Sequence, residues 1–221
     1  MTGSLRRMLR QSALGFAFGT TALAAMVAGA PAAKAQSCVE PALKAEQDHD
    51  LPPGLLLAMS LVESGSQGEP YAYAMNVNGR AVYPRSADEA SRQLVDRRGR
   101  LRSFATVGCV QLSVKHHRGK FDSVESMFNP WANTAYAAAY LRQHYNEQKS
   151  WAAAVQRYQG GSPAQRLEYQ CKIHSVLQKL DPVSAEQLAS SRCRGTTSKV
   201  VIAEHVQREF LENLDSLMAA R

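Results

Sequence analysis

The sequence predicts a mainly helical fold with a short β-hairpin and a helical segment appended at the C-terminus. Three observations support this prediction. Beyond Cys38, apolar residues recur at helical spacing, these stretches begin and end with helix-capping residues, and strand-like alternation is hardly seen. With 221 residues, of which 45% are hydrophobic and 20% charged, the chain has the composition of a globular protein with one main domain.

The N-terminus has the layout of a secretory signal peptide. Arginines at positions 6, 7 and 10 precede an uncharged stretch over 11–33, and Ala33-Lys34-Ala35 supplies small residues at a cleavage point. We therefore expect residues 1–35 to be removed after Ala35 and the mature protein to lie in the periplasm. The alternative is that 11–33 remains as a membrane anchor, although this stretch is rich in Ala and diluted by Gly, Thr and Ser.

Removal of the leader changes the charge of the protein. Residues 1–35 carry four basic side chains and no acidic ones, so 22 basic and 19 acidic residues remain. This weak bias does not indicate a nucleic-acid partner. No later stretch is long and apolar enough to span a membrane, so the processed chain is not expected to be an integral membrane protein. We expect the main domain over 36–180 and an appendage over 181–221.

The first half of the main domain is punctuated by Pro and Gly. A short amphipathic helix is expected over 38–48, and Pro52-Pro53-Gly54 then opens a buried helix that runs into Glu63-Ser64-Gly65. Turn-forming residues over 65–84 favour a β-hairpin. Ser86 and Glu89 form a capping-box pattern, which predicts a surface helix to about Arg98. The arginines at 97, 98, 100 and 102 are expected to be solvated, although an acidic ligand could bind to them.

The second half contains well-marked helix starts. Asp122 or Ser123 caps a short helix, and further helices are expected over 129–146, from Ser150 to Gly160-Gly161, and from Ser162-Pro163 to about Leu180. Residues 181–221 shift to Ser, Thr and charged residues and contain an amphipathic helix from about Lys199 to Leu217. Its apolar stripe either packs on the domain, which we favour, or docks a partner.

Four cysteines in an exported chain predict two disulfides. Three pairings are open. We favour Cys38 with Cys109 and Cys171 with Cys193, because the second bond closes a short local loop and the first ties the N-terminal helix to the middle of the domain. The sequence contains no CxxC pair or Cys/His ligand spacing, so no metal site is expected.

Glu63 is the most informative candidate for chemistry. It follows Leu61-Val62 at the end of an otherwise apolar helix, where burial would penalise its ionisation. Desolvation raises the pKa of a carboxyl group, and a carboxyl that is protonated near neutral pH can act as a general acid on a glycosidic oxygen. The alternative is that the side chain simply reaches solvent at the helix end.

Four motifs in order resemble those of the SLT-type lytic transglycosylases, enzymes of the goose-type lysozyme fold that cleave peptidoglycan. LLLAMSLVES over 55–64 is similar to the first motif, and GCVQL over 108–112 to the second. NPWAN at 129–133 with AYL at 139–141 resembles the third, and AVQRYQGG over 154–161 the fourth. The resemblance covers about 38–180. Val110 and Gln159 depart from it, because the family favours Met and Asn there.

The resemblance implies a lysozyme-like α+β domain with a single catalytic carboxyl, Glu63, and no cofactor. It implies contacts with the glycan for five further residues: Ser64, Gln111, Asn133, Tyr140 and Tyr158. Each of these could equally serve the structure alone, and for Tyr169 packing is the better expectation. The implied reaction cleaves the β-1,4 bond between N-acetylmuramic acid and N-acetylglucosamine and leaves a 1,6-anhydromuramoyl end.

Two alternatives remain at this stage. One is a hydrolytic muramidase, which uses water as the nucleophile. The other is an adaptor that only holds peptidoglycan glycan strands while the tail over 181–221 recruits a flagellar, secretion or division complex. An enzyme could also serve such a complex by opening the wall locally.

Overall fold

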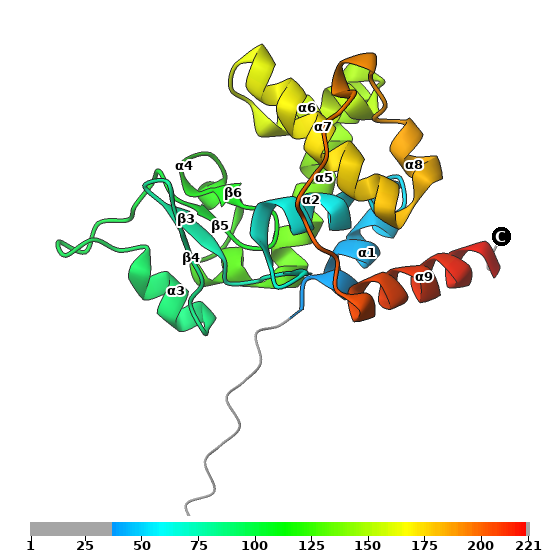
Figure 1. The fold of residues 1–221 in the computed structure, drawn as a ribbon. Coiled ribbons are helices and arrows are strands. Elements are labelled where there is room, and N and C mark those ends of the chain that lie inside the picture. Colours follow the sequence, from blue (N-terminus) through cyan, green and yellow to red (C-terminus); the bar gives the residue numbers. More distant parts are fainter. Residues whose placement is uncertain (1–36, 220–221) are drawn as a thin grey trace, which may run out of the picture. The chain divides into compact units, whose positions relative to one another are not determined.

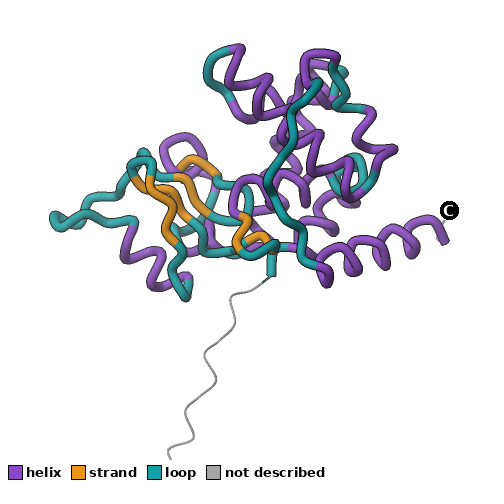
Figure 2. Tube along the Cα trace, in the orientation of Figure 1, coloured by secondary structure: helices purple, strands orange, loops and turns teal. Residues whose placement is uncertain are grey.

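The computed structural model describes residues 37–219, which belong to one compact unit of the chain. The expected signal peptide, residues 1–35, lies outside the described residues. Helices α1 (Val39–Asp48), α2 (Leu55–Ser64), α5 (Pro130–Gln148), α6 (Trp151–Gln159) and α7 (Pro163–Leu180) form the helical body. Short strands gather beside it, as Figures 1 and 2 show. The fold is therefore mainly α with a small sheet, as predicted.

The central element of the body is α2. Seven of its residues in succession, Leu55 to Leu61, are at most 1% exposed, and the helix packs between α1 and α7. Burial on every side requires an apolar sequence all round, which LLLAMSL supplies. Ser60 satisfies its hydroxyl inside the helix by donating to the Leu56 carbonyl at 2.9 Å. The last residues of α2 therefore have a fixed position in the fold.

Two small antiparallel sheets follow α2. Strands β1 (Gly65–Ser66) and β2 (Glu69–Pro70) pair with each other. Strands β3 (Met75–Val77), β4 (Arg80–Val82), β5 (Thr106–Val107) and β6 (Leu112–Ser113) form a sheet of order β4-β3-β5-β6. The β3–β4 hairpin turns at Asn78-Gly79, both with positive φ, which is a strong hairpin signal. The hairpin predicted over 65–84 is confirmed.

Most predicted helix starts are confirmed by their caps. The side chains of Ser86, Asn129, Ser150 and Ser162 each accept a hydrogen bond from the backbone N–H three residues on, and they begin α3 (Ala87–Gln93), α5, α6 and α7. The short helix expected after 122–123 is the 3₁₀ turn η2 (Glu125–Phe128), whose N-cap is Val124; just before it Ser123 Oγ accepts from the Ser126 N–H at 3.1 Å. A short helix α4 (Val114–His117) and the turn η1 (Arg118–Lys120) lie between the sheet and η2.

The end of α3 differs from the prediction. The helix ends at Gln93 and not near Arg98, because Asp96 folds the next residues into a turn. Its carboxylate accepts from the backbone N–H groups of Arg98 at 2.8 Å and Arg100 at 3.0 Å. Val95 and Leu101 then pair across this turn. Residues 94–104 thus form a projecting loop, here called the arm.

The C-terminal segment also differs in one boundary. It contains α8 (Pro182–Glu186) and the turn η3 (Ser191–Cys193), and its last helix, α9 (Glu204–Ala219), begins five residues after the predicted start at Lys199. The residues before α9 are held extended, because Lys179 Nζ donates to the Val200 carbonyl at 2.9 Å and Ala203 N–H donates to the Gly68 carbonyl at 3.0 Å. These partners come from distant elements.

The apolar stripe of α9 packs partly on the domain. Val206 and Phe210 are at most 1% exposed and belong to the main core, whereas Leu211 is 47% exposed. Phe210 lies against Gly54, where an added Cβ would come within 3.1 Å of its ring. The buried part of the stripe is therefore not open to a partner, in agreement with the packing that the sequence favoured.

Both expected disulfides are present. Cys38 bonds to Cys109, and Cys171 bonds to Cys193. The first joins the start of α1 to the loop between β5 and β6, and the second joins α7 to η3. Between them the two bonds use all four cysteines of the chain.

Candidate functional site

Glu63 lies in the last turn of α2, next to the break that ends the helix. At Gly65 an added Cβ would come within 2.2 Å of the Leu61 carbonyl oxygen, so only glycine allows the chain to leave the helix in this way. Gly65 begins β1. Glu63 is partly exposed as a residue.

The surroundings of Glu63 bring the pKa of its carboxyl close to neutral pH, so that both its protonated and its ionised forms are populated there. Burial raises its pKa from 4.5 to about 7, while Tyr169 and the positive charge of Lys172 act in the opposite direction. Both of these residues lie on α7, which packs against α2. Among the side chains that act on this pKa there is no second carboxylate. The group therefore has the protonation equilibrium that a general acid and base requires.

Tyr169 is the site residue whose position the sequence did not indicate. It is 6% exposed, and its hydroxyl interacts with Glu63 closely enough to lower the pKa of that carboxyl. The hydroxyl makes no hydrogen bond of good geometry within the described part of the chain. The spacing of Tyr169 and Lys172, three residues apart on one helix, places both side chains on one face. This spacing was visible in the sequence, but the direction of the face was not.

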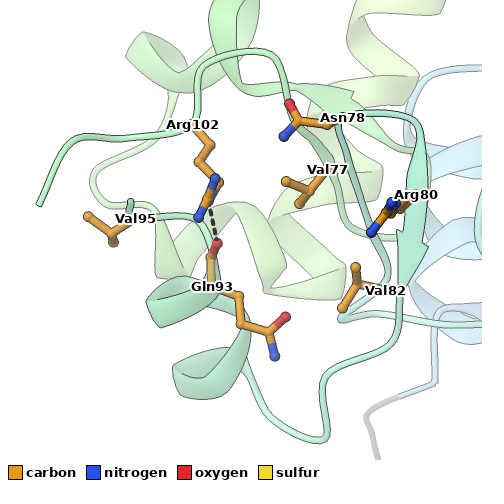
Figure 3. Close-up of a pocket in the computed structure, with 7 residues that line it drawn as sticks. All are labelled: Val77, Asn78, Arg80, Val82, Gln93, Val95 and Arg102. Atoms are coloured by element: carbon orange, nitrogen blue, oxygen red, sulfur yellow. Dashed lines mark hydrogen bonds between the residues drawn. The ribbon is translucent and has the colours of Figure 1, made fainter. Parts of the chain in front are cut away.

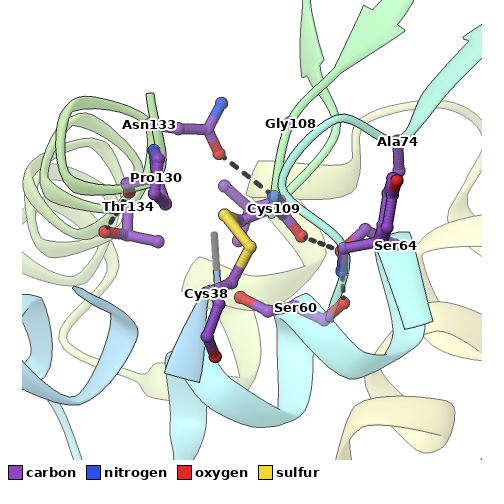
Figure 4. The surroundings of a disulfide bond; sticks show 12 residues. Cys38, Ser60, Ser64, Ala74, Gly108, Cys109, Pro130, Asn133 and Thr134 are labelled. Atoms are coloured by element: carbon purple, nitrogen blue, oxygen red, sulfur yellow. Dashed lines mark hydrogen bonds between the residues drawn. A yellow bond between two sulfur atoms is a disulfide. The ribbon is translucent and has the colours of Figure 1, made fainter. Parts of the chain in front are cut away.

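The turn over 108–111 is the meeting point of most of the predicted site residues. Ser64 Oγ donates to the Cys109 carbonyl at 2.7 Å, and Tyr158 Oη donates to the Val110 carbonyl at 3.0 Å. Asn133 Oδ1 accepts from the Val110 N–H at 3.2 Å. The Cys38–Cys109 disulfide lies in the same place (Figure 4). The first, third and fourth motifs thus contact one turn, which belongs to the second motif.

Ser64 and Asn133 hold this turn from the interior. They are 1% and 0% exposed, so the structure places both side chains beneath the surface. Asn133 Nδ2 also donates to the carbonyls of Val107 at 3.3 Å and Met127 at 2.8 Å. An added Cβ on Gly108 would come within 2.2 Å of this amide, so the close approach requires glycine.

Gln111 is partly exposed and has a fixed side chain. Its φ of 48° lies in the left-handed region, which is uncommon for a residue other than glycine. Its amide donates to the carbonyls of Ala74 at 3.0 Å and Gly108 at 3.1 Å, and its Oε1 accepts from Thr106 Oγ1 at 2.7 Å. The side chain is held rigid at the edge of β5, and the loop contacts that the sequence left open as an alternative are present.

Tyr158 and Tyr140 belong to a cluster of partly exposed aromatic rings. The two ring centroids lie 5.8 Å apart, and Tyr140 stacks on Tyr136 at 6.2 Å. His117 Nδ1 lies 2.9 Å from Tyr136 Oη. Burial and the charge of Glu63 raise the pKa of Tyr158 well above its usual value, so this hydroxyl stays protonated beside the carboxyl. The aromatic cluster thus extends from Glu63 across α6 and α5.

His117 thus joins the aromatic cluster through Tyr136 and Tyr140. In the part of the chain that the structure describes, no three His, Cys, Asp or Glu side chains are grouped as a metal site. No helix of residues 37–219 is both long and apolar enough to cross a membrane.

A helical domain with a small sheet and one carboxyl of raised pKa at the end of its central helix has the arrangement of a lysozyme-like enzyme. The family model of the transglycosylase SLT domain matches residues 40–171, more than half of the chain, and the chain therefore belongs to this family. No curated protein matches the chain. No solved structure matches it either. SLT enzymes are lytic transglycosylases that act on peptidoglycan, which lies outside the cytoplasm.

Proposed function

We propose that this protein cleaves the β-1,4 bond between N-acetylmuramic acid and N-acetylglucosamine without water, with Glu63 as its only catalytic carboxyl. The observation that carries the proposal is the pKa of Glu63 of about 7, together with the lack of a carboxylate among the side chains that act on it. A glycosidase that uses two carboxylates needs the second about 5–9.5 Å from the first. A single carboxyl that changes role between two steps fits this site better.

The two steps return Glu63 to its starting state. In the first, the protonated carboxyl donates its proton to the glycosidic oxygen, the bond from C1 to that oxygen breaks, and the N-acetylglucosamine end leaves as an alcohol. In the second, the carboxylate accepts the proton of the muramoyl 6-hydroxyl while O6 bonds to C1. The product is a 1,6-anhydromuramoyl end. The intramolecular hydroxyl competes well with water because it is held beside C1 at a high effective concentration.

The neighbours of Glu63 support both steps. Lys172 and Tyr169 favour the carboxylate form that the second step requires, and burial favours the acid form that the first step requires. Tyr158 lies near enough to Glu63 for the carboxylate charge to act on its hydroxyl, and the ring of Tyr140 lies 5.8 Å from that of Tyr158. Both rings are partly exposed, and such rings suit the apolar faces of sugars. We assign Gln111, Tyr140 and Tyr158 to the glycan and keep Ser64 and Asn133 as structural residues.

The mature chain incubated with purified peptidoglycan sacculi tests this function. Mass spectrometry of the released muropeptides should find 1,6-anhydromuramoyl ends, and Glu63→Gln should release almost none. Glu147→Gln, a change of the same kind at an exposed position of α5, is the matched control and should keep full activity. Reducing ends would instead identify a hydrolytic muramidase. Binding of sacculi without any release would identify an adaptor.

The same proposal includes the route and location of the protein. Residues 1–35 direct export and are removed, and the mature chain works in the periplasm. The two disulfides support this, because disulfides persist in oxidising compartments and are rare in the cytoplasm. The N-terminal sequence of protein purified from a periplasmic extract should begin at Gln36. A flagellar, secretion or division complex remains a prediction for the exposed parts of 181–221.

A further inference from the structure

A pocket lies on the far side of the β3–β4 hairpin from the turn that Gln111 braces. It has a volume of about 570 Å³ and is enclosed by the hairpin, the end of α3 and the arm (Figure 3). Its lining residues are Val77, Asn78, Arg80, Val82, Gln93, Val95 and Arg102. None of them acts on the pKa of Glu63 or belongs to the aromatic cluster. The volume lies in the range of pockets that hold small ligands.

The pocket has two guanidinium groups and no carboxylate in its lining. Arg80 and Arg102 stand on opposite walls with Val77 between them, as Figure 3 shows. Arg80 is exposed and makes no ion pair within residues 37–219. Arg102 Nε donates to the Gln93 carbonyl at 3.1 Å, which fixes the side chain along the wall. A fixed guanidinium is well suited to bind a carboxylate through two parallel hydrogen bonds.

The surroundings of the pocket extend this positive charge. Residues 80–120 carry ten Lys and Arg against three Asp and Glu. The remaining 12 basic and 16 acidic residues of the chain after residue 35 give the opposite sign. A predominantly positive surface around a pocket raises the local concentration of anionic ligands. The occupant should therefore be an anion.

The walls between the arginines are apolar and shallow. Val77, Val82 and Val95 supply this surface, and each of them remains partly or largely exposed. Small aliphatic side chains, such as that of alanine, would cover these valines without displacing them. An occupant with carboxylates at two points and small apolar groups between them matches the charges and the surface together.

We propose that this pocket binds the acidic stem peptide of peptidoglycan, a short chain of alanine and dicarboxylic residues. The inference rests on the proposed function, because that function makes peptidoglycan the substrate. Each exposed Arg–carboxylate pair contributes little in water. A stem that is tethered to a bound glycan strand nevertheless has a high local concentration, so weak contacts increase the affinity of the protein for the polymer. The peptide belongs either to the strand being cleaved or to a neighbouring strand.

Binding to a free stem peptide tests the proposal without turnover. The probe is a synthetic acidic stem tetrapeptide, with its fully amidated analogue as the uncharged comparison, and titration by NMR gives the Kd. The double variant R80Q/R102Q should bind the acidic peptide about tenfold more weakly than the wild type. The matched control R97Q/R98Q removes the same charge from the arm outside the pocket and should stay within about twofold of the wild type.

Three results would overturn the pocket assignment. The first is equal loss in both double variants, which would indicate diffuse charge. The second is equal binding of the amidated peptide. The third is failure of the peptide to bind while vesicles of anionic phospholipid bind in an Arg80-dependent manner, which would make the surface a membrane contact. Arg80→Gln alone controls for a change in the structure of the arm, because Arg80 lies on β4 and makes no ion pair with the arm. This single variant should lose part of the affinity for the peptide, and its Tm should equal that of the wild type.

This outcome is separable from that of the catalytic proposal. Glycan strands stripped of peptides by an amidase lack the pocket's ligand but keep the scissile bond. R80Q/R102Q should form anhydro ends from stripped strands at the wild-type rate and should lose activity only on intact sacculi. If Glu63 does not catalyse the reaction, stripped strands stay uncut by every form of the protein, while the peptide titration still reports on the pocket.

Discussion

At the scale of single residues, the site depends on a balance of effects on one carboxyl group. Burial of Glu63 raises its pKa, and Tyr169 and Lys172 from α7 limit the rise. Without these two residues the carboxyl would hold its proton more strongly and would be a weaker acid in the first step. Without the burial it would be ionised at neutral pH and could not act as an acid.

Removal of the Lys172 charge should shift the pH profile. The acid form of Glu63 is required in the free enzyme, so kcat/KM should fall as pH rises through its pKa of about 7. Lys172→Met removes an interaction that lowers this pKa, so the falling limb should move to higher pH. Lys172→Arg keeps the charge and should leave the limb in place. A limb that stays at the same pH in Lys172→Met would show that another group controls it.

Glu63 should also reduce stability at alkaline pH. Its folded pKa of about 7 exceeds the ordinary value of 4.5, so folding favours the protonated form. The group costs nothing below pH 4.5, and the cost grows until pH has risen above 7. Glu63→Gln should therefore unfold like the wild type at pH 4 and be more stable by up to about 3 kcal/mol at pH 9. Urea unfolding at both pH values measures this, and equal effects at both would contradict the assignment.

At the scale of elements, α2 has a carboxyl of raised pKa near each end. Glu46 from α1 is 4% exposed and accepts from the N–H groups of Gly54 at 2.7 Å and Leu57 at 2.9 Å. It thus satisfies backbone donors at the start of α2 that the helix itself leaves free. Burial raises the pKa of Glu46 to about 8. The start of the helix that carries Glu63 is fixed by this contact.

Loss of the Glu46 carboxyl should destabilise the domain. Glu46→Ala leaves two buried N–H groups without partners and opens a cavity, and we expect a loss of about 2–5 kcal/mol in the free energy of unfolding. Glu40→Ala, at an exposed position of the same helix, should change it by less than about 0.5 kcal/mol. Thermal and urea unfolding compare the two variants. Equal stabilities would mean that Glu46 does not anchor α2.

The boundaries that could be predicted are those that local chemistry decides. The starts of α5, α6 and α7 depend on an Asn or Ser cap within the segment itself. The end of α3 depends on a turn in which the Asp96 carboxylate accepts from backbone N–H groups that follow it. The start of α9 depends on Lys179 and Gly68, which are remote in sequence. The spacing of apolar residues along the sequence does not predict such hydrogen bonds.

The site residues divide in the same way: motifs identify the residues, whereas packing between distant elements decides their roles. The motifs identified the residues that meet around the 108–111 turn, but Ser64 and Asn133 turned out to support that turn from inside the protein. Burial of a polar residue depends on what packs over it, which a short motif does not reveal. The contact of Tyr169 with Glu63 was not predicted, because it depends on how α7 is rotated against α2.

At the scale of the whole molecule, the segment beyond the family match takes part in the main core. Phe210 of α9 is 1% exposed and covers Gly54, next to the start of α2. The segment over 172–221 therefore supports the helix that carries Glu63 from the end opposite to the chemistry. It adds to the fold whether or not it also recruits a partner.

This support can be measured with two adjacent residues. Phe210→Ala should lower the free energy of unfolding by about 3–5 kcal/mol, the usual cost of truncating a buried Phe. Leu211→Ala removes a side chain that is 47% exposed and should cost less than about 1 kcal/mol. Similar small losses for both would show that α9 is only loosely attached.

The two disulfides have a consequence for how the protein is made. Each bond joins cysteines that follow one another in the chain, Cys38 with Cys109 and Cys171 with Cys193. On the proposed route the chain is exported from its N-terminus, so the first pair is complete before the second emerges. An oxidase that joins each cysteine to the next one produces the native bonds directly. Maturation should therefore need oxidation alone and proceed at a normal yield in cells that lack a disulfide isomerase.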